Sequence, residues 1–465
     1  MRKLYSLTAS LLLFFVSFSQ ELPGFRAGNY AGVNSVFFNP ANIVDSRFRY
    51  DFNLLTFSSS IGNNKASFNL NDITTAFDTE NLINQLFSST GGFSSAMGNV
   101  DLRGPSLMFN TGQKMSIALT TRARAMVNVI DFDGGLGKQL MDDSDDDIQL
   151  PYSISSNADM QFKANAWTEL GFSVARVLSN KEKNFFKAGV TLKYLNGAGN
   201  GYLNISQLKS TLNEDAMGDV YLSNSTGRIA LGFGGIQLGE DFEPADFTQF
   251  NNTGFGADIG LVYEHRPEYD KMQEDGKPLN SRNKYKYKIG AALLDLGRIR
   301  YQKDMQRSGA YTIDITGNER FYLKDMEEID GFNDVFKSRP QYFTPASSNT
   351  EASYKVSLPS TLQLEFDYYI KGNIYANLAA QLPLSGTSEF NPRNYTSFTI
   401  TPRYEGKGIG LNLPINYNSL TDFNAGISFR LGPLFIGSGS VLTALMGSSK
   451  QADVHVGLHI AGLRK

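Results

Sequence analysis

Short stretches in which apolar and polar residues strictly alternate recur along this 465-residue chain, and they constrain its fold most. In residues 185–195, apolar side chains alternate with lysine, glycine and threonine, and the same period of two recurs in FGADIGLVYE (255–264) and TLQLEFDYYI (361–370). This period places successive side chains on opposite faces of a β-strand. Such strands build either a secreted all-β domain, with core against solvent, or a membrane barrel, with lipid against lumen.

The first residues, MRKLYSLTASLLLFFVSFSQ, predict a signal peptide over 1–19. A short basic start is followed by an apolar run that is too short for a membrane span, and small residues precede Gln20. The chain contains no Cys, so we expect neither disulfides, nor a lipoprotein anchor, nor a thiol nucleophile. The sequence therefore predicts an exported protein.

Composition narrows the class further. No run of 18 or more apolar residues follows the signal, which argues against helical membrane spans. Aromatic residues make up 12% of the chain and Gly occurs 44 times, as is common in proteins with many short strands and tight turns. The net charge of −3 gives no reason to expect a nucleic-acid partner.

The spacing of the strands favours a barrel, because connections in membrane barrels alternate between short periplasmic turns and long extracellular loops. We predict a single-chain antiparallel transmembrane β-barrel over 48–465, with a periplasmic C-terminus in the bacterial outer membrane. The range 196–253 is long enough to contain a further pair of strands. About fourteen strands are expected near 48–61, 100–110, 115–129, 158–178, 185–195, 254–264, 285–301, 360–370, 374–383, 394–405, 408–417, 421–431, 434–440 and 453–462. The long extracellular loops are expected at 62–99, 130–157, 196–253 and 302–359.

A barrel of this size encloses more space than wall side chains fill, so something must occupy its lumen. The segment 20–47 precedes the first strand, lacks alternation and is rich in Gly and Asn, which predicts an irregular N-terminal plug or hatch. Its central motif is Phe37, Phe38, Asn39, Pro40 and Ala41. Pro40 fixes a turn, Asn39 can bond turn backbone, and the two Phe side chains are expected to anchor the plug.

This stretch, YAGVNSVFFNPANIVDSR, resembles the hatch motif of FadL-type outer-membrane proteins. The stretches ALLDLGRIRY and LPSTLQLEFDYYI are similar to wall segments of that superfamily, particularly of PorV-like members tied to type IX secretion. The chain most resembles a family of uncharacterised outer-membrane barrels. The stretches that match this family are WTELGFSVARVL, GVTLKYLNGAG, GADIGLVYEHRP and RLGPLFIGSGSVL. The resemblance implies a fourteen-stranded barrel with a lumenal hatch. One departure is the end Leu463-Arg464-Lys465, which lacks the terminal aromatic residue of such barrels.

Charged residues in the polar phase of the strands should face the lumen, because a charge facing lipid at mid-bilayer costs several kcal/mol. Both signs are present, which suggests salt-bridged contacts to the plug, although charges bathed by lumenal water would give the same pattern. The predicted lumen-facing residues are Arg122, Arg124, Glu169, Lys187, Lys193, Asp258, Glu365, Asp367 and Arg403.

No catalytic motif is found, so we expect no enzyme, no cofactor and no metal site. His455 and His459 share one strand face but lie about 13 Å apart, too far for one zinc ion. The acidic run Asp142 to Asp147 lacks the Gly and distal Glu of a calcium loop and is expected to be solvated.

Two function classes remain. In the first, the barrel is a PorV-like accessory that binds an exported protein or a secretion or assembly complex. In the second, it is a FadL-like transporter of a hydrophobic small molecule. In both, outer-membrane lipid surrounds the wall. A transporter should contain an apolar tunnel beside the hatch, whereas an accessory should have a tightly filled lumen. The polar outer loops and charged lumen favour the accessory.

Overall fold

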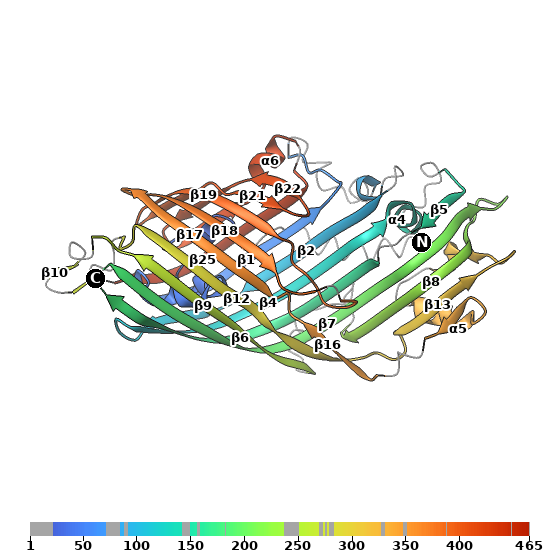
Figure 1. The fold of residues 1–465 in the computed structure, drawn as a ribbon, viewed down its shortest axis with the longest axis horizontal. Helices are drawn as coiled ribbons and strands as arrows, with labels where there is room; N and C mark the ends of the chain where they lie inside the picture. The colour runs from blue at the N-terminus through green and yellow to red at the C-terminus, as the bar shows by residue number, and fades with distance from the viewer. Residues whose placement is uncertain are drawn as a thin grey trace.

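The computed structural model describes residues 22–70, 84–87, 92–141, 149–155, 159–181, 183–236, 251–268, 273–274, 277–278, 283–326, 331–346, 351–386, 388–447 and 449–464. Almost all elements are strands of one large antiparallel sheet, and only short helices accompany them (Figure 1). Among the described residues, no helix has the length and apolar character needed to cross a membrane. The predicted signal peptide 1–19 and the acidic run 142–147 lie outside the described residues.

Fourteen wall strands form a closed antiparallel barrel, as the sequence predicted, because the last strand pairs with the first through Phe52 and Ile460. Four wall strands are each assigned as two pieces that follow one another along the wall. In order around the barrel, the strands are β1 (Phe48–Asn63), β2 (Phe93–Arg103) with β3 (Ser106–Asn110), β4 (Met115–Asp133), β6 (Met160–Lys181), β7 (Asn184–Glu214), β9 (Asn252–His265), β12 (Tyr287–Gln302), β17 (Thr361–Lys371) with β16 (Ser353–Ser357), β18 (Ile374–Pro383), β19 (Ser397–Glu405), β20 (Ile409–Asn412) with β21 (Ile415–Asn418), β22 (Asp422–Ala425) with β23 (Ile427–Leu431), β24 (Leu434–Ser438) and β25 (Gln451–Leu463).

The two faces of the wall have opposite polarity. On β7, Leu192 is 63% exposed on the outside, whereas its neighbour Lys193 is 4% exposed and faces the lumen. Outward apolar side chains recur on the neighbouring strands, for example at Leu261, Ile289 and Phe366. An apolar exterior around a polar interior is the arrangement of a transmembrane barrel. The protein therefore has the fold of a transmembrane β-barrel.

Tight turns connect strands at the end of the barrel that holds the C-terminus (Figure 1). Two of them, between β17 and β18 and between β23 and β24, begin with Gly372 (φ 59°) and Gly432 (φ 57°). A positive φ is readily adopted by Gly, so these residues suit such short connections.

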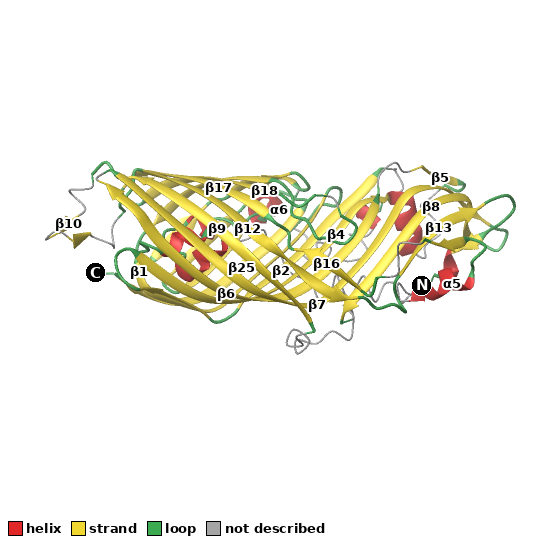
Figure 2. Ribbon diagram, turned by 60° about the horizontal axis from the view of Figure 1, so that its bottom comes forward, coloured by secondary structure: helices red, strands yellow, loops and turns green. Residues whose placement is uncertain are grey.

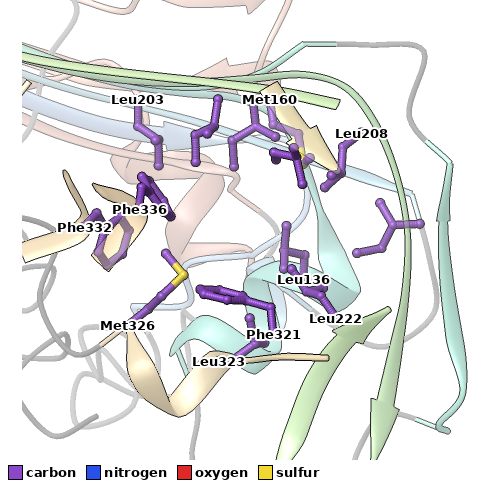
Figure 3. Close-up of a cluster of buried hydrophobic side chains, with 14 of the residues drawn as sticks. Leu136, Met160, Leu203, Leu208, Leu222, Phe321, Leu323, Met326, Phe332 and Phe336 are labelled. Carbon is purple, nitrogen blue, oxygen red and sulfur yellow. The ribbon is translucent and has the colours of Figure 1, made fainter. Parts of the chain in front are cut away.

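The opposite end carries a second body of structure, which we call the distal extension. It consists of the part of β7 after Gly197 and the remaining elements there: α4 (Gly134–Met141), β5 (Tyr152–Ser155), β8 (Val220–Gly235), β13 (Gly309–Ile315), β14 (Phe321–Tyr322), η6 (Leu323–Asp325), α5 (Phe332–Ser338) and β15 (Phe343–Pro345). Its inner side chains form an apolar core that includes Leu203, Phe321 and Phe336 (Figure 3). Here the inside is apolar and the outside polar, as in a water-soluble domain.

The distal extension corrects the predicted loops. The ranges 62–99, 196–253 and 302–359 contain ordered strands, including the start of β2, the second half of β7, and β8, β13 and β16. The range 130–157 contains the end of β4, α4 and β5. The alternation was hard to recognise there because bulges shift the pairing, for example between Ser206 and Lys209. The smaller elements β10 (Gln273–Glu274), β11 (Lys277–Pro278) and α6 (Val441–Leu445) lie in other connections.

The N-terminal segment, residues 22–47, lies inside the barrel near its C-terminal end (Figure 2). It forms three short 3-10 helices, η1 (Phe25–Ala27), η2 (Gly32–Phe37) and η3 (Pro40–Ile43). Nearly all of its side chains are buried against wall residues. The predicted placement of a small N-terminal segment in the lumen is confirmed.

Candidate functional site in the barrel lumen

The Asn39-Pro40-Ala41 motif joins the N-terminal segment to the wall. Asn39 is extended (φ −163°) and caps η3, because its Oδ1 accepts a hydrogen bond from the Ala41 amide at 2.9 Å. Its Nδ2 donates to the carbonyl oxygens of Leu261 at 3.1 Å and Ala291 at 3.3 Å. Pro40 occupies the first helical position, where its missing N–H costs nothing. One side chain therefore holds the turn and attaches it to β9 and β12.

Two glycines of the wall make room for this motif. Gly189 on β7 and Gly260 on β9 are directly paired across the sheet, and both face the lumen. A Cβ atom at Gly260 would lie 2.0 Å from Asn39 Oδ1, and one at Gly189 would lie 2.5 Å from the Pro40 carbonyl carbon. We call this pair the glycine socket, because any larger residue would displace the motif.

The two phenylalanines of the motif have different surroundings. Phe38 packs in an apolar cluster with Phe25 and Phe435, and the Arg103 guanidinium also lies 5.1 Å from its ring centre. Phe37 lies outside that cluster, with Arg103 and Arg122 4.4 and 5.0 Å from its ring centre. The expected anchoring by both rings thus combines apolar packing with cation–π contact.

A first ion-pair network crosses the middle of the lumen. Arg124 contacts Glu169 at 3.3 Å and Asp295 at 2.7 Å. Lys193 contacts Asp258 at 2.9 Å and the same Asp295 at 2.7 Å. All five side chains are almost fully buried and come from the wall strands β4, β6, β7, β9 and β12. The pairs therefore link strands across the lumen instead of lining an open channel.

A second network holds the end of the N-terminal segment. Asp45 contacts Arg266 and Lys284, each at 2.6 Å. Arg266 also contacts Glu264 at 2.5 Å, and Glu264 contacts Lys187 at 3.3 Å. Burial alone would raise the pKa of Asp45, but the two cations outweigh it and hold that pKa well below its usual range. Asp45 is therefore ionised at neutral pH and attached to the wall.

A third network lies on the nearby strands β17 and β19. Arg403 contacts Asp367 at 2.5 Å and Glu405 at 3.4 Å. Glu405 accepts hydrogen bonds from the backbone N–H of Asn29 at 2.6 Å and from its Nδ2 at 2.9 Å. Glu365 is 3.7 Å from Lys288. Glu405 thus joins the wall to the N-terminal segment at a further point.

The structure places every predicted lumen-facing charge inside the barrel and brings them into these networks. Arg122, which completes the set, contacts Asp101 at 2.6 Å. Sequence reasoning missed several partners. Asp295 sits in a bulge of β12 with φ 58°, for which the alternation gives no signal. Asp45, Arg266 and Lys284 lie outside the predicted strands, so no phase could be assigned to them.

His455 and His459 also face the lumen, as expected from their phase, but they contact different residues. His455 Nε2 lies 3.2 Å from the Ser428 hydroxyl. His459 Nδ1 lies 2.7 Å from the Asp51 carboxylate, which also accepts the Val33 amide at 2.6 Å. Within the described part of the chain, no group of three His, Asp or Glu side chains is placed to hold a metal ion.

Little free space remains beside the segment. A cavity of about 60 Å³ is lined mainly by polar and charged side chains, among them Arg47, Asp45 and Lys288. This volume is enough for a few water molecules. The lining of this cavity differs from the apolar passage expected for a transporter.

The profile of a protein family described as "Family of unknown function (DUF5723)" matches residues 40–439. The chain belongs to this family. The match begins at Pro40 and covers nearly the whole barrel, and it agrees with the resemblance to an uncharacterised outer-membrane barrel family. A search of curated proteins gives no match.

Solved structures similar to this chain include a FadL homologue, a toluene transporter and a hydrocarbon channel. A FadL homologue of Pseudomonas aeruginosa is 9% identical, with 95% of this chain and 96% of that chain covered and a TM-score of 0.44. The toluene transporter TbuX of Ralstonia pickettii is 12% identical, with 93% and 94% covered and a TM-score of 0.41. A mutant of TodX, a monoaromatic hydrocarbon channel, is 9% identical, with 96% and 97% covered and a TM-score of 0.34.

Proposed function

We propose that this barrel is an accessory or binding component of the outer membrane, which docks an exported protein or a secretion or assembly complex. The observation that supports this most is the filled lumen. The N-terminal segment is fixed by ion pairs at Asp45, by hydrogen bonds at Asn29 and Asn39 and by the glycine socket. Breaking several buried charge contacts together is costly, so the segment suits a permanent plug better than a moving hatch.

The proposal also includes an orientation. The distal extension faces the outside of the cell, and the short turns and the C-terminus face the periplasm, because long connections of membrane barrels lie outside. The extension then presents a folded surface to exported partners. No catalytic step and no cofactor is part of the proposal, since the lumenal acids and bases are engaged with one another.

The alternative is transport of a hydrophobic small molecule, which requires the N-terminal segment to move. A disulfide that locks the segment separates the two. A Cβ atom at Gly24 would lie 3.2 Å from Ser428 Cβ, slightly shorter than in ordinary disulfides, and the chain has no other Cys. Gly24→Cys with Ser428→Cys should therefore tie the start of the segment to β23.

We expect the oxidised double variant to keep its co-purifying partner proteins. Cells that carry it should take up a hydrophobic dye at the same rate before and after reduction of the disulfide. The two single variants are the matched controls, because neither can form the crosslink, and Gly24→Cys alone reports the strain of a side chain at φ 79°. Dye uptake that appears only after reduction, with no partner in either form, would refute the accessory role and support transport.

A further inference from the structure

A second, larger space lies away from the N-terminal segment. A cleft of about 1040 Å³ separates the distal extension from the barrel strands β12 and β16. Its walls come from β7, β8 and β13 on one side and from β12, β16 and the connection after β18 on the other. This volume is at the upper end of that of small-molecule sites. None of the lumenal networks described above reaches it.

The outer rim of the cleft is basic. Arg300 on β12 and Lys355 on β16 stand directly opposite one another, and both are exposed. Like charges in this position destabilise a strand pair unless a counter-charge lies nearby. Neither forms an ion pair with a described carboxylate, and Arg300 Nε donates only to the hydroxyl of Ser353, at 3.0 Å. Four basic and two acidic residues line the cleft, so an anion would be attracted there: Arg228, Arg300, Lys303 and Lys355 against Glu351 and Glu389.

The floor of the cleft is aromatic. Tyr202, Tyr354 and Phe390 surround one another with ring centres 5.5 to 5.8 Å apart. Tyr354 is fixed by a hydrogen bond from its hydroxyl to Asn200 Oδ1 at 2.8 Å. Rigid aromatic faces beside polar groups suit ligands that combine apolar C–H faces with polar substituents.

The cleft also lies just beyond the lipid-facing band. On the outer face, Phe255 packs against Tyr194 with ring centres 5.7 Å apart, at the position where aromatic residues border the bilayer. Phe255 pairs with Arg298, and Arg300 follows two residues later, about 7 Å further along β12. The basic rim is therefore at the level of lipid head groups.

We propose that the cleft binds the phosphorylated saccharide head group of a membrane glycolipid. Arg300 and Lys355 bind the phosphate, and the sugar ring packs on Tyr202 and Phe390. Arginine and lysine are the usual phosphate ligands of proteins. The glycolipid belongs to the outer leaflet in the orientation proposed above, but its binding depends neither on that orientation nor on the accessory role.

The proposal is tested with the full-length protein in detergent micelles and lipid A, a phosphorylated glucosamine lipid, as the probe. The double variant Arg300→Ala/Lys355→Ala should bind lipid A at least about tenfold more weakly, because contacts to a charged group are lost. Lys355→Arg should retain the affinity. Lys337→Ala is the matched control, since this exposed lysine lies on α5 outside the cleft. The heat-dependent gel mobility of each variant reports whether the barrel is folded.

Each other probe excludes a different ligand. Phe390→Ala should weaken lipid A binding and leave phosphatidylglycerol binding unchanged, because only the saccharide ring packs on Phe390. Equal affinity for phosphatidylglycerol and lipid A would mean a general anionic-lipid surface and overturn the proposal. Equal affinity for soluble glucosamine phosphate would assign a soluble ligand and overturn it too. Unchanged lipid A binding in the folded double variant would show that the rim is not the site.

Discussion

The substitution Gly260→Ala isolates the contact between the wall and the N-terminal segment. Gly260 lies in an extended strand, so the added methyl group is compatible with the backbone of β9. The new Cβ atom would lie 2.0 Å from Asn39 Oδ1 and 2.9 Å from Pro40 Cδ. Rotating the Asn39 side chain away relieves the first clash but not the second. The motif must therefore move, while the barrel itself is left unchanged.

The cost follows from the contacts that are lost. Asn39 gives up two hydrogen bonds from its Nδ2, to Leu261 and Ala291, each of which contributes about 0.5 to 1.5 kcal/mol. The clash with Pro40 adds the cost of overpacking, about 1 to 3 kcal/mol. Together these weaken the docking of the segment by about 2 to 5 kcal/mol, so the undocked population should rise at least about tenfold.

The assay combines limited proteolysis of the N-terminal segment with ion conductance in a planar bilayer. We expect faster cleavage within 22–47 and more frequent channel openings in Gly260→Ala, with unchanged heat-dependent gel mobility of the barrel. Gly98→Ala is the matched control, because its Cβ atom would meet only Val127, at 3.9 Å. Cleavage and conductance equal to those of the unaltered protein would refute the inference that Gly260 makes room for the motif. A barrel that fails to fold would refute the inference that the wall folds without the docked segment.

Two further predictions concern the barrel as a whole. Leu192→Arg should destabilise membrane insertion by about 2 to 4 kcal/mol, because Leu192 faces outward and is 63% exposed. Thr191→Ser, on the lumenal face, should leave insertion unchanged. Equal refolding yields of the two variants in lipid vesicles would contradict the assigned faces. An epitope tag inserted at Met217, in the turn between β7 and β8, should be labelled on intact cells. A tag at Gly112, in the turn between β3 and β4, should be labelled only after the cells are permeabilised. The reverse pattern would contradict the proposed orientation.

The wall of the barrel could be predicted from sequence because each strand carries its own signal. Lipid on one side and polar lumen on the other force a period of two over every membrane-crossing stretch. The predicted strands at 185–195 and 254–264 correspond to the membrane part of β7 and to β9. Errors of a few residues arose where a strand bends, as between β2 and β3, which are interrupted at Gly104 and Pro105.

The distal extension could not be predicted in the same way. β7 continues to Glu214, but its buried side chains change from Lys193 to Leu195 and Leu203 as it leaves the membrane. A bulge at Ala198 shifts the pairing with β6, so Leu203 lies on the face opposite to Lys193 and Leu195, and a search for one constant phase ends there. The bulge at Gln207, with φ 53°, also shifts the phase.

The candidate site could be predicted in part. The Asn39-Pro40-Ala41 turn was recognised from its residue types, and its lumenal position followed from its place before the first strand. The glycine socket was not recognised, because glycine on the polar face of a strand carries no sign of what it faces. Pairing partners such as Asp295 are brought to Lys193 and Arg124 only by closure of the barrel, which depends on register between distant strands.

The charge contacts fall into two groups, and their separation bears on function. Lys193, Asp258 and Asp295 belong to the wall and neutralise one another without help from the N-terminal segment. Asp45 belongs to the segment, and its partners Arg266 and Lys284 lie just outside the membrane strands β9 and β12. Loss of the segment would thus leave few uncompensated charges within the membrane part of the wall, where an unpaired charge is most costly. The barrel therefore does not need the segment for its own stability. A segment held this firmly in a wall that stays neutral without it is consistent with a role in closing the lumen, which the accessory function requires.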